Sequence, residues 1–224
     1  MDTPTTATTT PSDPDAALAP DDPRFTLAKA VMTTRAVMGG VADDQWDLPT
    51  PCGGMSVRNL LEHLVMVMRR IERAGRFVPT SEWPMDAADV PDGGWLDAFT
   101  SAAHETQAAW TSERLLEPRE LPWGVFPGDA VLGIYTNELT VHTWDLARAT
   151  GQQVDWDEAV LETSWQSIHQ QLPTGQRGDI WAAVKGSLPP DYPWEDPFGD
   201  AVPVADDAPL IDRLVAWNGR DPIG

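Results

Sequence analysis

The hydrophobic and polar positions of this chain follow the period of helices for most of its length. Apolar residues recur every three or four positions in five long stretches, at about 25–41, 56–73, 94–116, 130–150 and 157–172. This spacing is typical of amphipathic helices. Two shorter helices are expected near 179–184 and 208–217. We find no series of strands with a period of two, so the pattern predicts an all-α fold.

Capping residues mark where several of these helices begin and end. Ser56 is a favourable N-cap for the second helix, and Asp157 can cap the fifth with its own side chain. Gly75 and Gly151 follow the second and fourth helices, where glycine often terminates a helix. The segment PRELPWGVFPG, residues 118–128, is rich in turn formers and is expected to be a loop.

The two ends of the chain differ in composition from this helical body. Residues 1–22 consist largely of Thr, Pro, Asp and Ala without apolar periodicity, so we expect a disordered tail followed by one domain over 23–224. The tail has no basic residue and no apolar core, so it does not resemble a secretory signal, and a cytoplasmic protein is the default expectation. Beyond the fifth helix the chain is rich in Pro, Trp and Asp.

Charge and cysteine content exclude several functions. Acidic residues outnumber basic ones 35 to 15, which gives a net charge of −20. Such a surface repels phosphate backbones and anionic lipids, so neither nucleic acid nor a membrane surface is an expected partner. No apolar run approaches the ~20 residues needed to span a bilayer. Cys52 is the only cysteine, so an internal disulfide and a thiolate zinc cluster are impossible.

Three side chains on two predicted helices are candidate metal ligands. Glu138 and His142 are four residues apart in the fourth helix, which places them one turn apart on one face. His63 lies at the edge of the apolar face of the second helix. If these helices pack together, the three side chains can converge on one divalent ion. Three nitrogen and oxygen ligands leave a coordination position open, as in catalytic sites, and they suit zinc, nickel, iron or manganese.

A simpler interpretation of the same residues remains open. Glu and His fall four apart in many helices by chance, so Glu138 could be solvated while a half-buried His142 donates to a carbonyl. His104 and His169 have no carboxylate at that spacing and are expected on the surface.

Cys52 and the arginines of the second helix also allow two interpretations. A cysteine close to a helix N-terminus can have a lowered pKa and act as a nucleophile, but packing of a buried thiol is the more ordinary role. The basic residues of the helix form either a solvated face paired with acidic neighbours or a site for an anionic substrate. They are Arg58, Arg69, Arg70 and Arg73.

Three segments resemble motifs of a known family. TPCGGMSVRNLLEHLV, NELTVHTWDLARATGQ and ADDAPLIDRLVAWNGRDP are similar to segments of the mycothiol-dependent maleylpyruvate isomerase N-terminal domain and of its actinobacterial metal-binding subgroup. The similarity runs from about Phe25 to Pro222. It implies a DinB-like four-helix bundle with extra short helices and a loop-rich C-terminal tail. The isomerase itself continues into a sizeable C-terminal domain for which this chain has no room.

The resemblance also implies roles for individual residues. His63, Glu138 and His142 match the three metal-ligand positions, and zinc is the expected ion. Asp145 is implied to contact a thiol cofactor or to orient a ligand; alternatively it forms an ordinary salt bridge with Arg148.

Our first functional hypothesis is a metal- and thiol-dependent transferase or isomerase. A thiol bound at the open metal position would have a lowered pKa and attack an electrophilic substrate, and the resemblance implies that this thiol is mycothiol. The alternatives are a non-catalytic module that binds metal or a small ligand, and a metal-dependent hydrolase. Either a monomer or a homodimer is compatible with the sequence.

Overall fold

The computed structural model describes residues 18–19, 22–188, 196 and 198–223. Most of this part of the chain is helical. The elements are α1 (Pro23–Gly39), α2 (Val57–Gly75), α3 (Trp95–Ala109), α4 (Ser112–Leu115), β1 (Pro118–Leu121), β2 (Gly124–Pro127), α5 (Gly128–Thr150), α6 (Glu158–Gln171), α7 (Arg177–Ser187) and α8 (Leu210–Trp217). Short 3₁₀ helices lie at Asp43–Gln45 and Thr80–Glu82.

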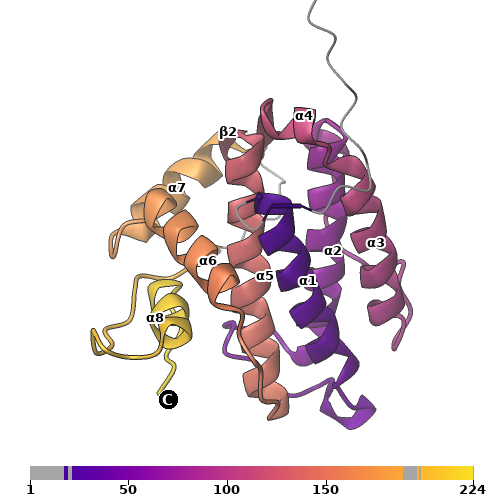
Figure 1. The fold of residues 1–224 in the computed structure, drawn as a ribbon. Coiled ribbons are helices and arrows are strands. Elements are labelled where there is room, and N and C mark those ends of the chain that lie inside the picture. The colour runs from indigo at the N-terminus through magenta and orange to yellow at the C-terminus, as the bar shows by residue number, and fades with distance from the viewer. Residues whose placement is uncertain (1–17, 20–21, 189–195, 197, 224) are drawn as a thin grey trace, which may run out of the picture.

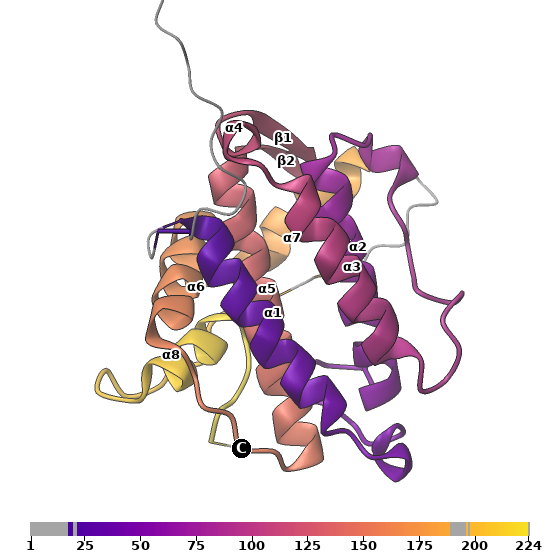
Figure 2. The same cartoon turned by 45° about the vertical axis from the view of Figure 1, so that its right-hand side comes forward.

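Helices α1, α2, α3 and α5 form a four-helix bundle (Figures 1 and 2). Each of these helices packs on two of the others: α2 on α3 and α5, and α1 on α3 and α5. Helix α6 covers the outer side of α5 and α1, and α8 packs against α5 and α6. The predicted all-α bundle with additional short helices is therefore confirmed, and α2 and α5 are neighbours. Within the described residues, none of the helices is long and apolar enough to cross a bilayer.

Helix α5 is the central element because other helices surround it. Nearly all of its residues from Val131 to Ala147 are buried, unlike those of a surface helix with one apolar stripe. Polar residues inside such a helix need partners. Thr143 pairs with Thr34 of α1 at 2.7 Å between the hydroxyl oxygens, and Asn137 exchanges amide hydrogen bonds with Asn218. These contacts hold α5 against α1 through Thr34 and against the end of α8 through Asn218.

The capping predictions at Ser56, Asp157 and Gly151 agree with the structure, whereas Gly75 is the last residue of α2 and Arg76 is the C-cap. The Ser56 hydroxyl accepts a hydrogen bond from the backbone N–H of Asn59 at the start of α2. Asp157 caps α6 by accepting from the first turn, and Gly151 ends α5 with a φ of 72°. The tail expected over 1–22 lies mostly outside the described residues, and Asp22 is the N-cap of α1.

The predicted helix at 94–116 is wrong only in its last third, after Ala109. Helix α3 ends at Ala109, and α4 begins only at Ser112. Between them Trp110 turns into the core, where its indole N–H donates to the Ile71 carbonyl at 2.9 Å. Burial of this large side chain redirects the chain, an effect that helical periodicity alone does not reveal.

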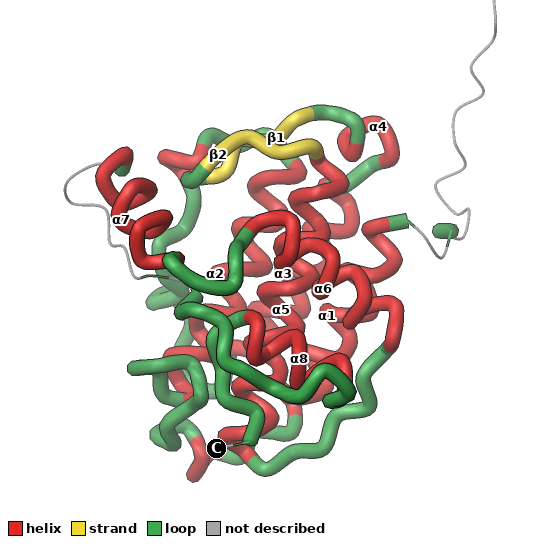
Figure 3. The backbone as a smooth tube through the Cα atoms, turned by 90° about the vertical axis from the view of Figure 1, so that its left-hand side faces the viewer, coloured by secondary structure: helices red, strands yellow, loops and turns green. Residues whose placement is uncertain are grey.

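The loop expected at 118–128 is a β-hairpin instead. Strands β1 and β2 pair antiparallel and lie across one end of the helices (Figure 3). Each strand has four residues, and the buried side of β1 carries Arg119 as well as Leu121. The Arg119 guanidinium lies 3.5 Å from the centroid of the Phe77 ring. A buried arginine removes the apolar alternation from which a strand is predicted.

Candidate metal centre

The bundle brings His63, Glu138 and His142 together. His63 extends from the middle of α2, and the other two extend from the middle of α5. Nε2 of His63 lies 3.2 Å from Oε1 of Glu138, and Nε2 of His142 lies 3.4 Å from the same oxygen. The two imidazole rings meet edge to face, with centroids 4.7 Å apart. The packing of α2 on α5 thus brings together the three candidate ligands predicted from the sequence.

The spacing of these atoms fits a tetrahedral metal ion. Zinc bonds of about 2.0–2.1 Å to nitrogen and oxygen place neighbouring ligand atoms roughly 3.3–3.4 Å apart around a tetrahedron. The two nitrogen–oxygen separations of 3.2 and 3.4 Å have this length. One possible ligand atom from each residue lies within 4.8 Å of the others. The described residues therefore offer a preformed set of two nitrogens and one oxygen.

A second layer of residues fixes the orientation of His142. Its Nδ1 lies 3.1 Å from Oδ2 of Asp145, one turn further along α5. With this nitrogen protonated and donating to the carboxylate, Nε2 is left as the nitrogen that faces Glu138. Asp145 is completely buried and receives two hydrogen bonds from Arg220, at 3.1 and 3.3 Å. Asp145 therefore contacts the His142 ring on one side and forms an ion pair with Arg220 on the other.

Burial and hydrogen bonding shift the pKa values of all three candidate ligands. Burial by itself raises the pKa of Glu138, but hydrogen bonds from His142 and His63 lower it well below its usual range. Burial lowers the pKa of His63. Burial also disfavours charge on His142, yet Asp145, Cys52 and Glu138 raise its pKa well above the ordinary value. The two carboxylates and the Cys52 thiol around His142 thus favour its protonated form more than water does.

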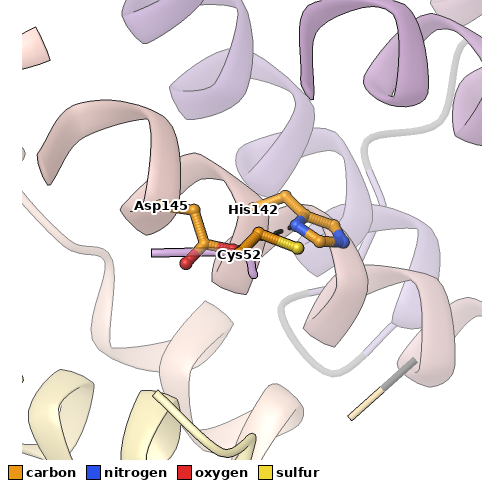
Figure 4. Close-up of side chains that lie close together, drawn as sticks. All are labelled: Cys52, His142 and Asp145. Atoms are coloured by element: carbon orange, nitrogen blue, oxygen red, sulfur yellow. Dashed lines mark hydrogen bonds and ion pairs between the residues drawn. The ribbon is translucent and has the colours of Figure 1, made fainter. Parts of the chain in front are cut away.

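Cys52 lies against the same histidine from the loop before α2. Figure 4 shows Cys52 and Asp145 together beside the His142 ring. Cys52, His142 and Asp145 also have ligand atoms within 4.8 Å of one another, so they form a second group of metal-binding residue types. However, Arg220 is bound to Asp145, and its positive charge would repel a cation placed there. The group containing His63 is the better candidate for a metal site for this reason.

The remaining histidines lie away from this centre. His104 is exposed on α3. His169 was expected on the surface, but it is half-buried between two tryptophans, with ring centroids 3.8 Å from Trp165 and 3.7 Å from Trp217. Its Nδ1 lies 2.8 Å from the Trp165 carbonyl oxygen. Its surface assignment is therefore wrong, because α8 covers this part of α6.

Three arginines of α2 hold the loop at 76–94 between α2 and α3. Arg58 pairs with Asp92, and Arg69 forms two hydrogen bonds with Asp89, at 2.6 and 2.9 Å. Arg70 donates to the backbone of this loop, at the Pro84 carbonyl 2.9 Å away. The structure therefore gives these arginines a role in loop attachment.

Two residues of the site were not recognised from sequence as neighbours of His142. The sequence indicates only a nucleophile or a packing residue at Cys52, and it places Arg220 only within the third motif. Arg220 lies 75 positions from Asp145 along the chain, so no local spacing connects them. The signal that could have identified Arg220 is a need for charge compensation, since a buried carboxylate requires a partner.

Comparison with known proteins gives a consistent result. The sequence profile described as the mycothiol maleylpyruvate isomerase N-terminal domain matches residues 27–147, a range that contains all three candidate ligands. Two uncharacterized proteins of Mycobacterium tuberculosis, from strains CDC 1551 / Oshkosh and ATCC 25618 / H37Rv, are each 30% identical to the chain over 207 residues. Each alignment covers 89% of this chain and 98% of the mycobacterial protein. No solved structure gives a significant match.

Proposed function

Because this chain belongs to the mycothiol maleylpyruvate isomerase N-terminal domain family, we propose that it is a metal-dependent protein that activates a low-molecular-weight thiol. The metal is held by His63, Glu138 and His142. The observation that carries this proposal is the meeting of two Nε2 atoms and one carboxylate oxygen at separations of 3.2 and 3.4 Å. Separations of this length are those expected between neighbouring ligand atoms of a tetrahedral ion.

The donor set favours zinc as the ion. Two neutral imidazoles and one carboxylate are borderline ligands that zinc accepts readily, and nickel, iron or manganese can occupy the same set. The Asp145 contact to Nδ1 supports the assignment, since a ligating histidine usually donates its other ring N–H to a carboxylate or carbonyl. Three protein ligands leave room for an exogenous group.

The bound metal would lower the pKa of a thiol at its open position, so that a thiolate is present at neutral pH. Asp145 keeps His142 in the ligating tautomer, and Arg220 compensates the buried charge of Asp145. The thiolate would then form a bond to an electrophilic carbon of the substrate. In a transferase this carbon–sulfur bond would remain and a leaving group would depart from the carbon, whereas in an isomerase the bond would break again after rotation within the substrate and the thiol would be released. The family indicates mycothiol as the thiol.

The proposal is tested by measuring turnover with and without metal and thiol. Zinc-loaded and chelator-stripped protein are each incubated with a chromogenic alkylating electrophile, with and without a thiol, and release of the chromophore is followed. We expect turnover only when both metal and thiol are present, with His104→Ala as an active control. Turnover without thiol would instead indicate a hydrolase. A metal-loaded protein that never turns over would indicate a non-catalytic binding module.

A further inference from the structure

The loop segment at 84–92 is pinned at both ends. Before it, Trp83 is buried, and its indole N–H donates to a carbonyl of the same loop at 2.9 Å. After it, the chain turns at Gly93, where φ is 80°, and enters α3 at the buried Trp95. Both ends are therefore fixed to the bundle, and glycine gives the second end a backbone freedom that other residues lack.

Two cavities lie between this segment and the bundle. The larger, of about 370 Å³, lies between the segment and helices α2 and α3, with Pro84 and Asp89 on the loop side. The smaller, of about 140 Å³, has Met85 and Asp86 on the loop side and His63 among the α2 residues opposite. Atoms that face a cavity lack packing partners there. The segment is therefore held to the bundle at a few points instead of along its length.

These points of attachment are weak. Three arginines of α2 bind the segment, at the Pro84 carbonyl and at the carboxylates of Asp89 and Asp92. The two aspartate side chains are 67% and 59% exposed, and ion pairs in such positions contribute little to stability. Within 84–92, all of which the structure describes, Ala87 is the one buried residue. Segments with few buried apolar contacts and exposed polar contacts open most readily.

The segment stands on the side from which solvent reaches the candidate ligands. The side chains of His63 and Glu138 are 21% and 20% exposed, whereas that of His142 is 5% exposed. His63 faces the smaller cavity, and Met85 lies across it. The guanidinium of Arg70, which carries one of the attachments, lies 3.9 Å from the Met85 sulfur. Movement of the segment away from α2 would therefore uncover His63 further.

We propose that residues 84–92 form a lid that opens between Trp83 and Gly93 and controls how fast a metal ion reaches and leaves the candidate centre. The inference rests on the proposed function, since it requires an ion at His63, Glu138 and His142. The lid acts on rates alone. An ion that passes only while the lid is open has its association and dissociation rates multiplied by the same open fraction, so its affinity does not change.

The test variant is Asp89→Asn with Asp92→Asn, which removes both ion pairs. It leaves Arg58 in contact with the Trp46 and Trp95 rings. Loss of two exposed pairs should raise the open fraction about fivefold. Zinc association is measured by stopped flow with a fluorescent zinc indicator, and dissociation by transfer of zinc to excess chelator. Both rates should rise about fivefold, and the dissociation constant should keep its parent value.

The matched control is Asp22→Asn with Asp157→Asn. These aspartates pair with Arg24 and Lys29, so the control also loses two ion pairs and two negative charges. They are the N-caps of α1 and α6, and asparagine caps a helix about as well as aspartate does. The control should keep both zinc rates of the parent, which excludes an effect of net charge on the attraction of the cation.

Hydrogen exchange of the metal-free protein tests the lid without zinc. Amides over 84–92 are followed by mass spectrometry, including the Val90 N–H, which donates to the Ala87 carbonyl at 2.9 Å. They should exchange about fivefold faster in the Asp89→Asn, Asp92→Asn variant than in the parent and the control. Amides in the middle of the buried helix α5 should exchange at the same rate in all three proteins.

The outcomes separate the lid from the proposed function. A parent that binds no zinc contradicts the proposed function, and the gating role falls with it. Zinc binding with unchanged rates in the Asp89→Asn, Asp92→Asn variant, or with unchanged amide exchange over 84–92, overturns the lid alone. A faster dissociation with an unchanged association rate also overturns it, because the ion pairs then support the site instead of controlling a passage. Rates that rise equally in the control overturn it too, because net charge then explains the effect.

Discussion

Replacing Asp145 by leucine should weaken metal binding and destabilise the fold through two separate effects. The carboxylate accepts from His142 Nδ1 at 3.1 Å, and loss of such a contact to a metal-ligating histidine typically costs 10–100-fold in metal affinity. This range corresponds to about 1.4–2.7 kcal/mol. The same substitution leaves Arg220, which is 6% exposed, without its carboxylate. A stranded buried charge costs about 3–5 kcal/mol, a large fraction of the stability of a domain.

A second substitution separates the two effects. Arg220→Met removes the stranded charge, so the double variant Asp145→Leu, Arg220→Met should recover most of the stability lost by Asp145→Leu. Its metal affinity should remain low, because His142 still lacks its acceptor. Stability is measured by urea unfolding in chelator, and zinc affinity by competition with a chromogenic chelator. If Asp145→Leu keeps zinc affinity within about twofold of the parent, or if the double variant restores it, the role assigned to Asp145 is wrong.

Three further outcomes follow from the same geometry. Zinc binding near neutral pH should release about one proton, because the raised pKa of His142 favours a protonated ring in the metal-free site and the metal must displace that proton. Zinc affinity should therefore rise with pH until the pKa of His142 is passed. Calorimetry in buffers of different ionisation enthalpy measures the number of protons released. Cys52→Ser should keep its metal content and most of its activity, since the proposed nucleophile is an exogenous thiolate; loss of turnover in a folded, metal-loaded variant would make Cys52 the nucleophile. Gly75→Ala should lower the unfolding free energy by about 1–3 kcal/mol without changing metal stoichiometry, because an added Cβ would lie 2.7 Å from the Trp110 indole nitrogen. Unchanged urea unfolding would refute the close packing of Gly75 against Trp110.

The features that could be predicted from sequence are those encoded over a few residues. Helical periodicity and the caps at Ser56, Gly151 and Asp157 predict α2, α5 and α6, because each signal lies within one or two turns. The relation between Glu138 and His142 is equally local, since the helix itself sets it.

The features that sequence could not supply depend on which elements become neighbours. His63 is 75 positions from Glu138, and Arg220 is 75 positions from Asp145, so both contacts exist only after the helices pack. The pattern of α5 also gave no indication that α6 and α8 would cover its outer side. Burial on all sides explains why its polar residues need partners on other elements.

The hairpin and the break after α3 were missed for a different reason. In both places a large or charged side chain is buried where the local pattern predicts a turn or a continuing helix. Arg119 lies inward in β1, and Trp110 turns into the core after Ala109. Tertiary burial overrides local propensity at such positions.

The central claim is tested most directly by metal stoichiometry in single-ligand variants. Zinc content by elemental analysis, with far-UV circular dichroism to verify folding, is compared for the parent, His142→Ala and the exposed control His104→Ala. We expect about one zinc per chain in the parent and in His104→Ala. His142→Ala should remain helical but lose most of its zinc, because two ligands hold a divalent ion far more weakly than three. A folded His142→Ala that binds zinc like the parent would contradict the account.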